Sequence, residues 1–206
     1  MALIEHYPYR GFESYDVEPV EEVSSNISLS IVTSFTERDK AALIDQLEIS
    51  NVDYINAVDG LSDFKKSLKP VYYNDALKNV DTEYVLIIDS YDTIIHGIDD
   101  MPGCLSHYDK DMVYGAWRYH FPTFISFDFN VPEENELKFL NSGVFFGKTE
   151  SVKQYYSDLS DYIKANQDTD NNWLNDFEQY WVYKYLSENG RENLGIDYDE
   201  VLVENK

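Results

Sequence analysis

The segment Tyr84-Val85-Leu86-Ile87-Ile88-Asp89-Ser90-Tyr91-Asp92 is a run of apolar, largely β-branched residues that ends in two carboxylates three positions apart. A short apolar run with polar residues on either side predicts a strand that is buried on both faces of a parallel sheet. Ligands of open α/β sheets bind just outside the carboxyl ends of the strands. We therefore expect Asp89 and Asp92 to lie at a functional site.

The two carboxylates allow two interpretations. Hard oxygen ligands close together suit Mg²⁺ or Mn²⁺, which typically bridges protein carboxylates to the phosphates of a substrate. Alternatively, Asp89 and Asp92 are turn-forming and helix-capping residues, as in many α/β proteins.

The rest of the chain alternates strand and helix signals, which predicts an α/β domain with a mostly parallel central sheet flanked by helices. We expect one domain over residues 28–206, preceded by an irregular acidic arm over residues 1–27. Expected strands cover 27–33, 52–56, 84–88, 112–117, 139–146 (interrupted at Asn141-Ser142-Gly143) and 200–203. Expected helices cover 37–49, 70–79, 149–165 and 176–188, the first with Thr36 and Asp39 as a capping box and the second with Pro70 in its first turn.

Two connections stand out between these elements. Residues 57–69 form a loop with the basic cluster Lys65, Lys66 and Lys69. Residues 118–138 are aromatic and irregular, and long loops of this kind in compact domains are often functional. We expect this second loop to cover a site and to select an acceptor.

Composition restricts the possible partners. The chain has 206 residues and a formal net charge of −23, so direct binding to nucleic acid or to an anionic membrane is not expected. Solubility alone could explain most of the charge, but an anionic substrate would need a metal ion or local lysines to offset it. One cysteine, no secretory signal and no long apolar run together predict a cytoplasmic protein.

Four segments occur in a fixed order: Val32-Thr33-Ser34, Asp89-Ser90-Tyr91-Asp92, Phe139-Leu140-Asn141-Ser142-Gly143-Val144-Phe145-Phe146-Gly147 and Asp176-Phe177-Glu178-Gln179. Together they resemble the glycosyltransferase domain of the procollagen-lysine hydroxylases. More loosely, they resemble GT-A glycosyltransferases in general, with a Rossmann-like fold. The resemblance extends from about residue 28 to about residue 203.

The resemblance implies roles for individual residues. The expected metal ligands, for Mn²⁺ or Mg²⁺ on the diphosphate of a UDP-sugar, are Asp89 and Asp92. The residues expected to contact the nucleotide-sugar donor are Thr33, Ser34, Lys69, Asp89, Ser90, Ser142 and Gly143. The expected catalytic residues, on the donor-sugar and acceptor side, are Asn141, Glu178 and Gln179.

The expected function is that of a metal-dependent, hexosyltransferase-like enzyme that moves a sugar from a nucleotide sugar to an unknown acceptor. A divalent cation stabilises a leaving diphosphate as a Lewis acid, and a carboxylate such as Glu178 complements an oxocarbenium-like sugar. The alternative is a non-catalytic nucleotide-sugar-binding relative, or an acidic decoy or interaction protein. The family has a third metal ligand, a histidine after its last strand, for which the candidates here are His96, His107, His120, Glu204 and Asn205.

Overall fold

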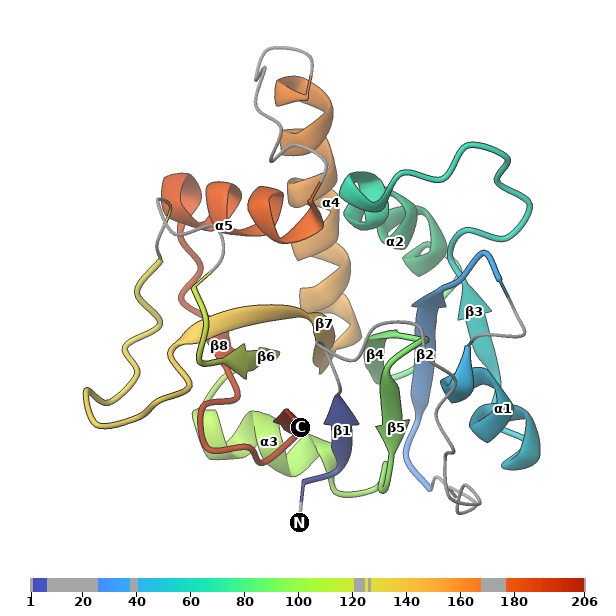
Figure 1. The fold of residues 1–206 in the computed structure, drawn as a ribbon, viewed down its shortest axis with the longest axis horizontal. Coiled ribbons are helices and arrows are strands. Elements are labelled where there is room, and N and C mark those ends of the chain that lie inside the picture. The colour runs from blue at the N-terminus through green and yellow to red at the C-terminus, as the bar shows by residue number, and fades with distance from the viewer. Residues whose placement is uncertain are drawn as a thin grey trace.

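A computed structural model describes residues 2–6, 26–37, 41–120, 125, 127–167 and 177–205. Two sheets and the helices around them form the fold (Figure 1). The strands are β1 (Ile4–His6), β2 (Leu29–Ser34), β3 (Tyr54–Asn56), β4 (Tyr84–Asp89), β5 (Thr93–Ile95), β6 (Met112–Trp117), β7 (Phe139–Lys148), β8 (Leu194–Ile196) and β9 (Val203–Asn205). The helices are α1 (Ala42–Ile49), α2 (Lys69–Leu77), α3 (Met101–Tyr108), α4 (Thr149–Asn166) and α5 (Glu178–Asn189), with a short 3-10 turn, η2 (Lys66–Leu68), before α2.

The main sheet has six strands in the order β3-β2-β4-β7-β6-β8. Strand β2 pairs in parallel with β3 and with β4, and β6 pairs in parallel with β8. Strand β7 is antiparallel to both of its neighbours, β4 and β6. The sheet is therefore mixed, with more parallel than antiparallel pairs, and the α/β class is confirmed at that level.

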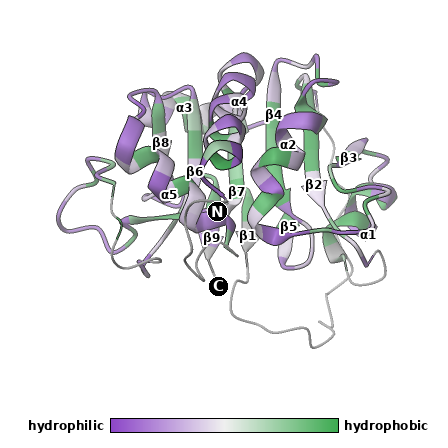
Figure 2. Ribbon diagram, turned by 90° about the horizontal axis from the view of Figure 1, so that it is seen from above, coloured by the Kyte–Doolittle hydropathy of each residue, from purple (hydrophilic) through white to green (hydrophobic). Residues whose placement is uncertain are grey.

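Helices cover both faces of this sheet, and each face has its own core. Helices α2, α4 and α5 lie on one side, and α1 and α3 lie on the other (Figure 1). The first core includes Tyr73, Phe145 and Trp181, and the second includes Ile44, Leu86 and Met101. The central strands are largely green, hydrophobic ribbons in Figure 2, whereas the helices alternate between hydrophilic and hydrophobic stretches. Burial on both faces explains why these strands are almost continuously apolar.

Strand β7 shows how an interruption in the sequence appears in the fold. The pairing with β6 jumps from Tyr114↔Phe145 to Gly115↔Asn141, so residues 142–144 have no partner on that side. The strand nevertheless extends over Phe139–Lys148, and its pairing with β4 begins at Ile88↔Val144. The expected break at residues 141–143 is therefore a β-bulge within one ten-residue strand.

Several elements differ from the prediction. Residues 4–6, expected to be irregular, form β1 between β5 and β9 in the smaller sheet. The region between β4 and β6, expected to be only a connection, contains β5 and α3, and β8 was not predicted. Helix α1 begins at Ala42 instead of residue 37, without a side-chain cap. Asp39 of the proposed capping box, the rest of the arm over residues 7–25, and Asp176 lie outside the described residues.

Within the part of the chain that the structure describes, no helix has the length and apolar character needed to cross a bilayer.

Candidate functional site at the carboxyl ends of β2 and β4

The candidate site begins where two parallel strands end side by side. Ser34 and Asp89, the last residues of β2 and β4, are partners in register. Because Ile88 pairs with Val144 of the antiparallel strand β7, the earlier residues of β7 continue past the end of β4 at the same edge. This edge is where ligands of open α/β sheets bind.

Lys69, the first residue of α2, joins this edge to α5. Its ammonium group donates a hydrogen bond to Oδ1 of Asp89, and its Nζ lies 3.5 Å from Oε2 of Glu178. The Lys69 side chain is only 13% exposed. Burial lowers the pKa of Lys69, but the nearby Asp89, Tyr73 and Glu178 raise it well above its usual value. The lysine is therefore a buried cation between two carboxylates that are 89 residues apart in the sequence.

Glu178, the first residue of α5, has an unusual environment. Its side chain is 9% exposed, and its Oε1 has no hydrogen-bond partner among the described residues. Burial raises the pKa of Glu178 from 4.5 to about 7, against the lowering effect of Lys69, while the charge of Asp89 raises it further. A buried carboxylate with one unsatisfied oxygen is a group to which a ligand could bind.

The predicted hydroxyl residues form bonds within the protein. Thr33 donates through Oγ1 to the carbonyl of Ile88 at 2.7 Å, and Ser90 donates through Oγ to the carbonyl of Ser34 at 3.1 Å. Thr33 and Ser90 are fully buried, and Ser34 is almost so. These bonds join the end of β2 to β4 and to the turn after it, so in this structure the three residues support the shape of the edge.

The other predicted residues come from β7 and the first turn of α5. The amide and Oγ of Ser142 each lie 3.4 Å from Oε1 of Gln179, so the bulge of β7 contacts the start of the helix. Asn141 is buried and accepts a hydrogen bond from the amide of Gly143 at 3.0 Å. Thus the structure brings the segment around Ser142 into contact with the segment that contains Glu178 and Gln179. Glu178 in turn connects both segments to Lys69, which pairs with Asp89.

Two tyrosines at this site were not among the predicted site residues, although one of them, Tyr91, lies within the Asp89–Asp92 segment. The hydroxyl of Tyr73 lies 3.0 Å from Oγ of Ser34, and the hydroxyl of Tyr91 accepts hydrogen bonds from the amides of Thr36 and Glu37. Tyr73 follows Lys69 by four positions, so both lie on one face of α2. That spacing was the available signal, but a chain with 18 tyrosines gave no reason to single it out.

Asp89 and Asp92 carry the kind of oxygen ligands that a divalent cation prefers. Asp89 ends β4 with its side chain 28% exposed, and Asp92 is half-buried in the turn before β5. Carboxylates suit Mg²⁺ or Mn²⁺. Among the described residues, however, no group of three or more His, Cys, Asp or Glu is placed to hold a metal ion. The remaining ligands would have to come from substrate and water.

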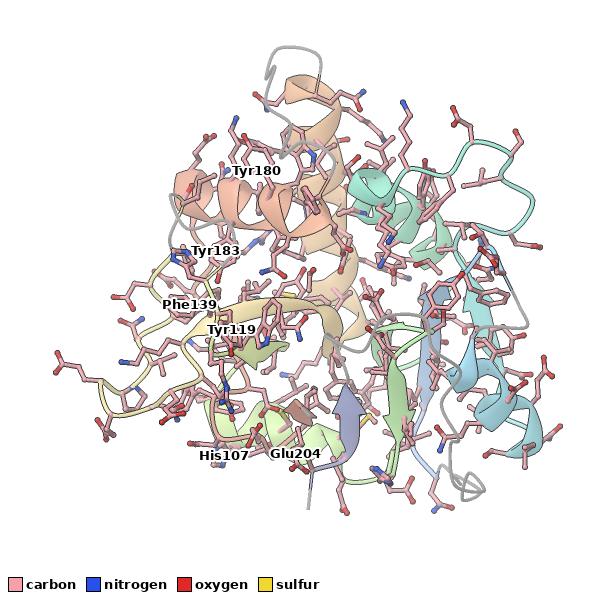
Figure 3. The ribbon with its side chains drawn as sticks, viewed as in Figure 1. His107, Tyr119, Phe139, Tyr180, Tyr183 and Glu204 are labelled. Atoms are coloured by element: carbon pink, nitrogen blue, oxygen red, sulfur yellow. The ribbon has the colours of Figure 1, made fainter. Side chains whose placement is uncertain are left out.

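The histidines that could have supplied a third ligand have other partners. Nε2 of His107 lies 2.9 Å from Oδ2 of Asp199, and His120 stacks on Phe139 with ring centroids 4.5 Å apart. Figure 3 shows His107 and Glu204 well away from Tyr180 and Tyr183 of α5. The structure therefore gives no support to His107 or His120 as a metal ligand.

Comparison with known proteins adds no further information: no family model matches the chain, and no curated protein matches it either.

Proposed function

We propose that this protein is a metal-dependent glycosyltransferase of the GT-A type that takes its sugar from a nucleotide sugar, with UDP as the leaving group. The proposal rests on the family resemblance of the sequence and on one feature of the fold.

That feature is the meeting of Lys69, Asp89 and Glu178 at the carboxyl ends of β2 and β4. The resemblance assigns roles to all three residues, and they come from three different parts of the chain, α2, β4 and α5. The bulge of β7 with Ser142, next to Gln179, extends the same cluster.

The charge of the cluster supports a cation and an anionic ligand. The carboxyl groups of Asp89 and Glu178 offset the ammonium group of Lys69, so these three side chains carry no surplus positive charge to hold a diphosphate. Asp89 and Asp92 would hold Mn²⁺ or Mg²⁺, and the bound cation would supply Lewis-acid stabilisation of the leaving diphosphate. Lys69 would add a second positive charge toward the same phosphates.

The remaining residues would act on the sugar. Glu178 would place a carboxylate near the positive charge that develops at the anomeric carbon. Gln179 and Ser142, already in contact, would present polar atoms to the sugar hydroxyls. The buried amide of Asn141 would keep the bulge of β7 in shape, so that the backbone around Gly143 can approach the donor closely.

The test is binding and turnover of nucleotide sugars by the full chain, with MnCl₂ and with EDTA. We expect UDP and UDP-sugars to raise the melting temperature more than GDP- or ADP-sugars, and calorimetry to show tighter UDP binding with Mn²⁺. Release of UDP from a UDP-sugar would support an enzyme. Equal UDP affinity with Mn²⁺ and with EDTA would contradict the metal bridge, and binding without release would favour a non-catalytic relative.

A further inference from the structure

The ammonium group of Lys69 already pairs with Asp89, one of the two carboxylates that the proposed divalent cation would need. It donates to Oδ1 of Asp89, and the two side chains are 13% and 28% exposed. We propose that Lys69 is an internal counter-cation that competes with the divalent metal for Asp89, so that metal and nucleotide bind together and the metal alone binds poorly. This inference rests on the proposed function and concerns the order of binding at the same site.

Burial makes this competition significant. An exposed ion pair contributes little, because water and salt screen it. Lys69 and Asp89 are largely removed from water, so the attraction between them is stronger than on the surface. Lys69 is also held in place, because it begins α2 directly before Pro70, and Tyr73 one turn later is buried in the first core. A cation that binds Asp89 must therefore displace a fixed, paired charge.

The structure also provides a place for the displaced ammonium. Oε2 of Glu178 lies 3.5 Å from Nζ of Lys69, and Oε1 of Glu178 has no hydrogen-bond partner among the described residues. When a metal binds Asp89, Lys69 can keep Glu178 as a counter-ion and gain a phosphate oxygen of the donor. Without a nucleotide, the displaced ammonium has Glu178, with which it already pairs, but no phosphate that replaces Asp89.

This difference produces positive coupling between metal and nucleotide. A nucleotide diphosphate offers Lys69 a new anionic partner, which lowers the free-energy cost of releasing Asp89. Coupling between two ligands is reciprocal, so Mn²⁺ must tighten UDP binding by the same factor as UDP tightens Mn²⁺ binding. Lys69 contributes part of that coupling factor. Removing Lys69 should reduce the factor, because Mn²⁺ alone would then bind more tightly.

The experiment measures Mn²⁺ binding by electron paramagnetic resonance, which counts free Mn²⁺, with and without UDP. In Lys69→Met we expect Mn²⁺ alone to bind about tenfold more tightly than in the wild type, the scale of removing one nearby unit charge from a partly buried site. The ratio of the Mn²⁺ affinities with and without UDP should fall in the same variant. Lys66→Met is the matched control, because it removes the same charge from an exposed lysine three positions away, and it should change the Mn²⁺ affinity less than twofold.

A second variant keeps the test decisive if Lys69→Met does not fold. Lys69→Arg retains the positive charge and can pair with a carboxylate through two parallel hydrogen bonds. We expect it to bind Mn²⁺ alone more weakly than the wild type. Tighter binding by Lys69→Arg, or unchanged or weaker binding by a folded Lys69→Met, would overturn the competition.

The two proposals fail in different ways. If the wild type binds no Mn²⁺ even with saturating UDP, the metal-dependent function itself is wrong. If the wild type binds Mn²⁺ with UDP but Lys69→Met leaves the affinity for Mn²⁺ alone unchanged, the proposed function stands and only the role of Lys69 is refuted.

Discussion

The hydroxyl of Tyr73 lies 3.0 Å from Oγ of Ser34, and both side chains are buried. This bond connects α2, which begins with Lys69, to the last residue of β2. The bond therefore helps to hold the start of α2, with Lys69, at this edge of the sheet. A substitution can remove the bond without changing the charge of the site.

Tyr73→Phe should lower the free energy of unfolding by about 1–2 kcal/mol, since it removes a buried hydrogen bond and leaves Oγ of Ser34 with one partner fewer. The measurement is urea denaturation followed by circular dichroism. Tyr72→Phe, at the neighbouring half-buried position, is the control and should change the stability by less than about 0.5 kcal/mol. Equal losses in the two variants would show that the Tyr73–Ser34 bond contributes nothing specific.

Glu178→Gln should keep the UDP affinity within about twofold while lowering turnover of a UDP-sugar by a factor on the order of 10². The amide has the same shape but cannot supply a negative charge to the sugar. Steady-state kinetics and calorimetry measure the two quantities separately. Glu150→Gln, at an exposed position on α4, is the charge-matched control. A collapse of UDP binding in Glu178→Gln would assign the residue to the nucleotide or the metal.

Glu178 also predicts a pH dependence of stability. Burial raises its pKa from 4.5 in the unfolded chain to about 7 in the fold, so the native state holds the proton more tightly. The resulting stabilisation is fully present below pH 4.5 and is lost as the pH rises through about 7, with a slope of at most about 1.4 kcal/mol per pH unit. Between pH 4.5 and 8, the free energy of unfolding should therefore depend less steeply on pH for Glu178→Gln than for the wild type. Parallel curves would contradict the raised pKa.

Asp92→Asn should weaken UDP binding by about tenfold in Mn²⁺ and leave it unchanged in EDTA, because only the metal-dependent part of the affinity is affected. Isothermal titration calorimetry in both buffers measures the difference. Asp81→Asn, in the exposed turn before β4, makes the same chemical change outside the site and should have no effect. A loss of UDP affinity that is equal in both buffers would make Asp92 a structural residue of the turn.

Asp197 should be essential for the stability of the smaller sheet. It accepts hydrogen bonds from the amides of Val201, Leu202 and Val203 at 2.9, 2.9 and 2.6 Å, and from the hydroxyl of Tyr108 at 2.9 Å. In Asp197→Asn one oxygen becomes a donor, so buried amides lose their acceptor. We expect a loss of roughly 2–4 kcal/mol in the free energy of unfolding.

The control for this change is Asp199→Asn. The side chain of Asp199 is 44% exposed and pairs with the exposed side chain of His107, so the loss of its charge should cost less than about 1 kcal/mol. Hydrogen exchange adds a local readout, because the amide of Ile4 donates to the carbonyl of Leu202. That amide should exchange faster in Asp197→Asn, and an unchanged rate would show that Asp197 does not hold β1.

Helices and strands were predictable where the hydrophobic pattern within a single segment indicates the element. The apolar run of β4 and the periodic apolar face of α4 are local patterns, and both elements lie close to the predicted bounds. Helix α3 was missed because Pro102 and Gly103 resemble a loop, although Ile98, Met101 and Leu105 lie three to four positions apart and are buried together. Strand β1 has only three residues, and its partners lie about 90 and 200 positions away, so no local pattern could reveal it.

The candidate site was predictable to a similar extent. Asp89, Lys69 and Glu178 were selected individually by the resemblance, but the ion pairs between them follow from the way α2 and α5 pack over the edge of the sheet. A sequence pattern does not contain that packing. The same limit explains why Tyr73 was missed, since its partner, Ser34, lies 39 positions earlier.

The smaller sheet has a practical consequence for handling the protein. Strand β1 pairs with β5, residue for residue from Ile4↔Ile95 to His6↔Thr93, and β5 begins directly after Asp92. Trimming the first six residues would therefore remove the hydrogen-bonding partner of β5 and loosen the turn that carries this carboxylate. A bulky tag next to β1 could disturb the same pairing, so Mn²⁺ and UDP affinities measured with a tag and without one should be compared.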